Sequence, residues 1–92
     1  MKKIIINEIE YEIVEDYKNG LDKEVIEEKL TEYFEPYDYI IGDWAYGKLR
    51  LKGFCEKSNS LYRPINDIAC KDTYIQQECA YECRYFVLRK CK

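Results

Sequence analysis

The sequence predicts an α+β fold, with a single sheet of about five strands and two helices in the order β-β-α-β-β-α-β. Segments in which apolar and polar residues alternate, a pattern typical of half-buried strands, occur near the start and in the middle of the chain. Two helix-forming segments stand between the predicted strands, and both helices are expected to pack on one face of the sheet. At 92 residues the chain is long enough for one core, so we expect a single domain over residues 1–92.

The N-terminal segment predicts a β-hairpin. Three isoleucines at residues 4–6 are followed by Asn7-Glu8 and then by residues 9–13, which alternate strictly between apolar and acidic side chains. The apolar side chains of this second arm are expected to face the core, and its glutamates to face water. Asn19-Gly20 carries a turn signal that ends the unit.

Two helices are predicted. Residues 21–34 place apolar side chains at helical spacing along one stripe, with acidic residues in the first turn, where they stabilise the helix dipole. Pro36 is expected to end this helix, because the residue before a proline disfavours the helical conformation. The second helix is expected to begin at a capping residue, Asp67, and to run to about Cys79.

Three further strands are predicted in the second half of the chain. Residues 37–43 are rich in tyrosine and isoleucine and indicate a buried strand. Residues 44–47 form a turn into residues 48–54, which alternate with a period of two, and residues 83–88 form the last strand. Leu49 and Leu51 are expected on one face of the 48–54 strand, and Lys48, Arg50, Lys52 and Phe54 on the other.

Composition and charge argue against an enzyme. The chain has no histidine, which removes the usual general base and the commonest neutral metal ligand. Its net charge of −3 combines an acidic segment, residues 1–36 with five Lys/Arg and eleven Asp/Glu, with a basic remainder. No apolar run approaches the roughly 18 residues of a membrane helix, and the first apolar run stops at Asn7, short of a signal peptide. We therefore expect a cytoplasmic protein without a cofactor, a membrane contact or a small-molecule substrate.

The five cysteines allow two interpretations. Cys79 and Cys83 form the single pair with a spacing that suits zinc, and a complete site would need two of Cys55, Cys70 and Cys91. The alternative is that these residues are small buried apolar side chains in a reducing compartment. A thiol site at the Cys79–Cys83 pair stays open as a hypothesis.

The turn and strand at residues 43–54 are the candidate binding site. One interpretation is that Trp44, Tyr46 and Phe54 flank Arg50 and Lys52 on an open sheet face, where aromatic rings could stack on bases and cations could contact phosphates. The alternative is structural: the glycines permit the turn, Asp43 bonds nearby backbone N–H groups and Trp44 folds over the core. In this interpretation cations and aromatic rings pair across strands without a ligand. The candidate residues are Asp43, Trp44, Tyr46, Lys48, Arg50, Lys52 and Phe54.

Two sequence blocks resemble the YutD-like family of small proteins from low-GC Gram-positive bacteria. Residues 37–44 read YDYIIGDW and residues 49–54 read LRLKGF, close to the YDYIVGDW and LRLKGF stretches of the family. Residues 78–88 are similar to the family's C-terminal signature, with Glu82 and Arg84 where glycine and alanine are usual.

The resemblance covers nearly the whole chain and implies an α+β fold with no established activity, in a family sometimes labelled a transcriptional regulator. We therefore expect a non-catalytic binding or regulatory module that acts through a protein partner. The alternative is binding of nucleic acid, as RNA or in association with the ribosome, through the basic and aromatic residues of the candidate site.

Overall fold

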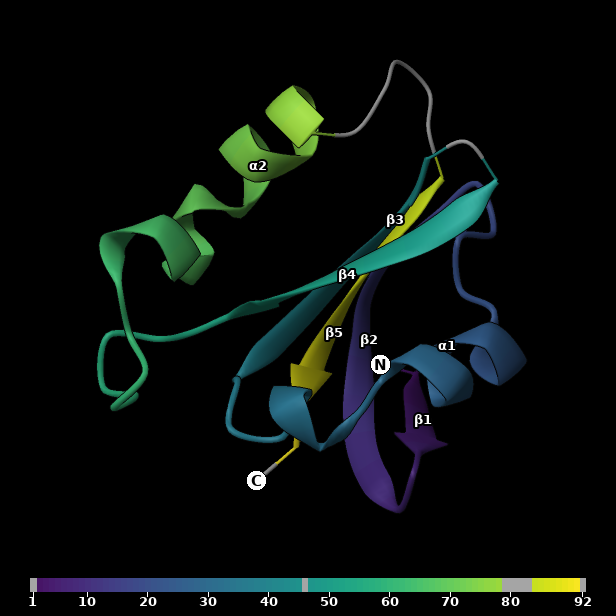
Figure 1. Cartoon of the computed structure of the whole chain (residues 1–92), viewed down its shortest axis with the longest axis horizontal. Helices are drawn as coiled ribbons and strands as arrows, with labels where there is room; N and C mark the ends of the chain where they lie inside the picture. Colours follow the sequence, from purple (N-terminus) through teal and green to yellow (C-terminus); the bar gives the residue numbers. More distant parts are fainter. Residues whose placement is uncertain (1, 46, 79–83, 92) are drawn as a thin grey trace.

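The computed structural model describes residues 2–45, 47–78 and 84–91 and contains one antiparallel five-stranded sheet (Figure 1). The strands are β1 (Lys3–Ile6), β2 (Ile9–Tyr17), β3 (Tyr39–Ala45), β4 (Lys48–Phe54) and β5 (Tyr85–Lys90). The α-helices are α1 (Lys23–Lys29) and α2 (Lys71–Glu78), and the 3-10 turns are η1 (Glu32–Phe34), η2 (Pro64–Asn66) and η3 (Ile68–Cys70). The predicted α+β class, single sheet and element order are confirmed. No helix in these three described ranges is long and apolar enough to cross a membrane.

The β1–β2 hairpin follows the prediction and closes through a two-residue turn. Asn7 and Glu8 both have positive φ, 50° and 71°, and Ile6 pairs with Ile9 on either side of them. Positive φ at both turn residues matches the right-handed twist of the flanking strands, which is why asparagine is favoured in such a turn. The alternation of the second arm buries Tyr11 on the core side.

Helix α1 is shorter than the predicted span of residues 21–34. Asp22 caps its start, and its side chain accepts a hydrogen bond from the Val25 amide at 3.4 Å. At the other end the Asn7 amide group donates to the Leu30 carbonyl at 2.8 Å and to the Glu27 carbonyl at 3.2 Å. The hairpin side chain thus satisfies terminal carbonyls, so the helix stops there and the chain re-enters a separate turn, η1.

Strand β5 lies at the centre of the sheet although it comes last in the chain. The strand order is β1-β2-β5-β3-β4, so β5 pairs with β2 on one side and with β3 on the other. Phe86, Val87 and Leu88 are fully buried. Gly42 of β3 is the register partner of Phe86. This glycine leaves room for the Phe86 ring, since a Cβ at position 42 would lie 2.2 Å from Phe86 Cζ.

The two helices cover opposite faces of the sheet, so the expectation that both pack on one face is wrong (Figure 1). Successive strand residues alternate between the faces: Ile40 packs with α1, and Ile41 packs on the α2 side. Because β5 and β3 are apolar on both faces, each face needs its own cover. The cluster on the α1 face contains Ile6, Tyr11, Ile26, Leu30, Ile40, Leu49, Phe86 and Leu88.

The α2 segment is attached to the second face by polar and apolar contacts. Asp67 caps as predicted, by accepting from the Ala69 amide at 2.9 Å, but the element that it caps is the 3-10 turn η3, and the α-helix α2 begins later, at Lys71. Lys71 forms an ion pair with Glu15 of β2, and the Tyr85 hydroxyl donates to the same carboxylate at 2.9 Å. The pairing with Glu15 raises the pKa of Lys71, which keeps the ion pair intact at neutral pH.

Replacement of Gly42 tests the packing at the sheet centre. Gly42→Ala places a methyl group inside the contact distance of the Phe86 ring, and we expect it to lower the free energy of unfolding by about 1–3 kcal/mol. Urea denaturation followed by circular dichroism measures this change. Gly47→Ala is the control, because a Cβ there meets no atom within 4 Å and its cost comes from the positive φ of 74° alone. In a Phe86→Leu background Gly42→Ala should cost less free energy of unfolding, because the clashing ring is gone. An unchanged unfolding midpoint for Gly42→Ala alone would contradict the close contact between Gly42 and the Phe86 ring.

Candidate binding surface around strands β3 and β4

Asp43 and Arg50 form a pair across β3 and β4. The two residues are register partners, and the Arg50 guanidinium donates to Asp43 Oδ2. The Asp43 side chain is 2% exposed and that of Arg50 is 46% exposed, so the arginine carries the carboxylate's countercharge at the sheet surface. The other carboxylate oxygen, Oδ1, is buried without a hydrogen-bond partner in the described chain. The main role of Arg50 is therefore to compensate the charge of the buried Asp43 carboxylate.

Trp44 lies on the opposite face from Arg50 and Lys52. Its indole Nε1 donates to the Gly20 carbonyl at 2.7 Å, and it packs against the cluster on the α1 face. The Arg84 guanidinium lies 4.6 Å from the centre of the indole ring. The tryptophan thus joins the turn after β2 to the sheet. The interpretation in which it flanks the cations on one open face is wrong, and the structural alternative, in which Trp44 folds over the core, agrees with the structure.

Phe54 shares the face of Arg50 and Lys52 but is fully buried. It packs with Ile41 and Val87, and its ring centre lies 5.3 Å from that of Tyr74 on α2. The Lys52 ammonium lies 5.7 Å from the Phe54 ring centre and 5.6 Å from that of Tyr74. Lys52 therefore lies over an aromatic pair whose Phe54 ring is buried and whose Tyr74 ring is partly buried, so Phe54 is closed to a stacking base.

The structure thus divides the predicted binding set. Asp43, Arg50, Lys52 and Phe54 lie together, Lys48 is exposed at the start of β4, and Trp44 lies on the other face. Tyr46 lies outside the described residues, as do Cys79 and Cys83 of the thiol hypothesis.

The described cysteines are free. Cys55 is buried, Cys70 is exposed and Cys91 is partly exposed. Burial is the main cause that raises the pKa of the Cys55 thiol, with the nearby charge of Asp38 adding to it, so this side chain stays a neutral thiol. Within residues 2–45, 47–78 and 84–91 no group of three or more Cys, Asp or Glu is placed to hold a metal ion.

A groove runs beside β4, on the edge of the sheet, and one of its walls is aromatic. The Tyr33 and Tyr37 ring centres lie 5.7 Å apart with their hydroxyls at 3.3 Å, and Phe34 packs edge-on to Tyr33 at 5.1 Å. Tyr33 is 67% exposed, an unusual state for an aromatic ring with aromatic neighbours. Tyr37 lies close over the backbone of Gly53, because a Cβ there would fall 2.4 Å from the Tyr37 ring.

The other wall of this groove is η2, which carries an exposed isoleucine. Ile65 is 77% exposed. Two hydrogen bonds of Asn66 hold η2 in place. The Arg63 amide donates to Asn66 Oδ1 at 2.7 Å, and the Cys55 amide, just past the end of β4, donates to the Asn66 carbonyl at 2.8 Å. The groove has a volume of about 250 Å³ and is lined by Tyr33, Phe34, Tyr37, Leu51, Lys52, Gly53, Ile65 and Asn66. We call it the β4 groove.

The candidate site analysis of the sequence missed the β4 groove. A signal was present in the aromatic residues around Pro36 and in Ile65, an apolar residue within a polar loop. The predicted helix over residues 21–34 includes Tyr33 and Phe34 in its apolar stripe, where both would be buried. Because α1 ends early, Tyr33 instead stands on a separate turn and remains exposed.

Comparison with known proteins identifies the family. The family described as "Putative antitoxin YutD-like" matches residues 5–89. The chain is 38% identical to the Bacillus subtilis (strain 168) protein named "Putative antitoxin YutD", over 97% of this chain and 98% of that protein. This chain belongs to the YutD-like family.

The fold of the YutD-like domain also matches a solved structure. The solution NMR structure of protein yutD from B. subtilis superposes with a TM-score of 0.80 at 37% identity, covering 100% of this chain and 84% of that chain. The description of the family and the name of the B. subtilis relative both refer to an antitoxin, and neither refers to transcriptional regulation.

The Asp43–Arg50 pair of this YutD-like domain gives a stability prediction. Arg50→Ala leaves the Asp43 carboxylate buried without the guanidinium, and we expect the free energy of unfolding to fall by about 1–3 kcal/mol. In an Asp43→Asn background the same arginine substitution should cost less, because no charge remains to be compensated. Chemical denaturation of the four proteins in a double-mutant cycle measures the coupling. Lys48→Ala, an exposed cation of the same strand, is the control, and equal effects of Arg50→Ala in both backgrounds would argue against the pair.

Proposed function

We propose that this YutD-like domain is a non-catalytic binding module of the cytoplasm that acts through a protein partner, as the antitoxin names of its family and relative suggest. In that role the partner is the toxin protein. The observation that carries the proposal is the β4 groove, where Tyr33 and Ile65 stand 67% and 77% exposed on either side of an edge strand. Exposed apolar side chains that line a groove mark sites of protein interaction.

The position of the β4 groove suits an extended segment of the partner. β4 is the last strand in the sheet order, so no strand of the described residues lies along one side of its backbone (Figure 1). An extended peptide that adds to such an edge gains main-chain hydrogen bonds, and pockets beside the edge select alternate side chains. We propose that an apolar side chain of this segment enters between Tyr33 and Ile65.

Charge favours an acidic partner segment at this edge. Lys48 and Arg50 are exposed along β4, and Lys52 lies in the wall of the groove itself. A basic edge strand disfavours pairing with another copy of itself, because the same cations would face one another. Acidic residues in the partner segment would supply the opposite charge and accelerate association.

The described residues supply no catalytic arrangement that would compete with this proposal. The chain has no histidine, and among the described cysteines the Cys55 thiol has its pKa raised by burial, which disfavours the reactive thiolate. The sequence alternative was RNA or ribosome-associated binding through the basic residues of β4. Trp44 lies on the other face and Phe54 is buried, so neither ring that this alternative used lies open beside those cations. The antitoxin names of the family and of the relative instead favour the protein partner.

Capture of the partner by variants of the full chain tests the proposal. We expect Ile65→Glu to reduce recovery of the bound protein from a lysate of the source organism by about tenfold, since loss of a central interface contact costs about 1.4 kcal/mol or more. Val14→Glu is the matched control, because Val14 is also exposed, at 39%, and lies on β2 away from the groove. A photo-crosslinking residue in place of Tyr33 should attach to the same protein.

Nuclease treatment separates the two classes of partner. Recovery that survives nuclease, depends on residue 65 and yields a crosslink from position 33 supports the proposed function. Recovery that nuclease abolishes and that falls steeply with salt would assign the domain to nucleic acid instead. Equal losses for Ile65→Glu and Val14→Glu would remove the β4 groove from the account.

A further inference from the structure

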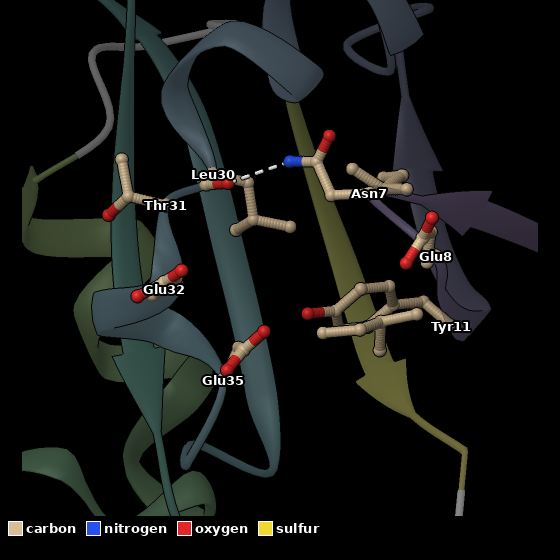
Figure 2. A pocket seen from close by; sticks show the side chains of 9 residues that line it. Asn7, Glu8, Tyr11, Leu30, Thr31, Glu32 and Glu35 are labelled. Atoms are coloured by element: carbon tan, nitrogen blue, oxygen red, sulfur yellow. Dashed lines mark hydrogen bonds between the residues drawn. The ribbon is translucent and has the colours of Figure 1, made fainter.

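A second pocket lies between the β1–β2 hairpin and the segment that follows α1 (Figure 2). Its volume is about 470 Å³. The hairpin turn forms one wall and the residues from Leu30 to Glu35 form the other. The lining residues are Ile6, Asn7, Glu8, Ile9, Tyr11, Leu30, Thr31, Glu32 and Glu35. We call it the hairpin pocket.

The hairpin pocket is acidic, and its charges are not compensated within the described chain. Glu8, Glu32 and Glu35 line it, and no lysine or arginine does. None of these three glutamates takes part in an ion pair with another described residue. They belong to the acidic segment, residues 1–36, which carries eleven Asp/Glu against five Lys/Arg.

The hydroxyl of a buried tyrosine points into this acidic space. The Tyr11 side chain is 1% exposed, and Figure 2 shows its hydroxyl directed between Leu30 and Glu35. That hydroxyl has no hydrogen-bond partner in the described chain. The ring is held in the core while the hydroxyl opens into the pocket, so this group is fixed in place and available to a ligand. Burial raises the pKa of Tyr11, and the charge of Glu35 raises it further, so the hydroxyl stays neutral and can accept a hydrogen bond from a cation.

The walls of the hairpin pocket are held in place before any ligand binds. Asn7 donates from the hairpin turn to the Leu30 and Glu27 carbonyls, which fixes the distance between the two walls. The floor is apolar, because Ile6 and Leu30 are buried there and Ile9 lies beside them. The pocket therefore combines an apolar floor with carboxylates at its rim.

We propose that the hairpin pocket binds a guanidinium group carried on an aliphatic stem, which is the chemistry of an arginine side chain. The stem packs on Ile6, Ile9 and Leu30, and the guanidinium donates to the rim carboxylates and to the Tyr11 hydroxyl. A guanidinium has five N–H donors in one plane and accommodates several acceptors that are too far apart for one metal ion. In agreement, no described group of three acidic or thiol side chains is compact enough to hold a metal.

One cation of the described chain, Lys90, lies beside the hairpin pocket and contacts its wall. The Lys90 ammonium donates to the backbone carbonyl of Glu35, and not to its carboxylate. It therefore anchors the end of β5 to the wall of the pocket and leaves the glutamate side chain for a ligand. The same contact holds Glu35 in position.

Titration of the full chain with N-acetyl-arginine methylamide tests the proposal by ¹⁵N–¹H NMR. We expect chemical-shift changes confined to amides of residues 6–11 and 30–35, and none of comparable size with the uncharged citrulline analogue. Glu35→Gln should weaken binding about fivefold or more, because a charge-assisted hydrogen bond is lost. Tyr11→Phe should weaken it about two- to fivefold while the spectrum shows an intact fold. Glu28→Gln, an exposed residue of α1 outside the pocket, is the matched control.

Two results would overturn the site: equal shifts from the arginine and citrulline probes, or equal affinities for Glu35→Gln and Glu28→Gln. Partner capture with the Glu35→Gln variant identifies the source of the guanidinium, and this experiment rests on the proposed function. If Glu35→Gln also reduces recovery of the protein that depends on Ile65, the arginine belongs to that partner. If recovery is unchanged while the probe still binds the wild type, the ligand is a free guanidinium compound. The role of the β4 groove is then tested separately, by Ile65→Glu and by the crosslink from position 33.

Discussion

The fold depends on the insertion of β5 between β2 and β3, with the Phe86 ring seated over Gly42. The last strand of the chain pairs on both sides and is buried on both faces, so it joins the N-terminal hairpin to the β3–β4 pair. Without it neither half has a complete sheet on which a helix can pack. Isolated two-stranded units are marginally stable in water, so both halves need this strand to form a core.

Because the sheet is covered on both faces, binding is left to the rims, where turns meet strand ends. The β4 groove lies where η1 and η2 flank an edge strand, and the hairpin pocket lies where the β1–β2 turn meets the end of α1. One site is apolar with basic neighbours, and the other is acidic. A rigid sheet with functional turns at its edges is a common arrangement for a binding domain.

Local patterns in the sequence predict much of the fold but not the sharing of faces. Strict alternation predicts β4 at residues 48–54 as observed, and Asp67 is the cap that its side chain predicts. The predicted helix over residues 21–34 is longer than α1, whose end is capped by the side chain of Asn7, a residue far away in the chain. The sequence leaves two positions open for Trp44, beside the cations of β4 or over the core, because the face that a strand residue occupies is decided by the register with its neighbours. The β4 groove and the hairpin pocket arise from such distant contacts, so an isolated apolar residue such as Ile65 is a signal for the groove but does not define its walls.

Native-state hydrogen exchange tests the central role of β5 most directly. The account predicts that the amides of Phe86, Val87 and Leu88 exchange only through global unfolding, with a free energy equal to that from denaturant, whereas amides of α2 exchange through a smaller local opening. Exchange of the β5 amides as fast as those of α2 would contradict the account, because the strand would then be an addition to a sheet that stands without it.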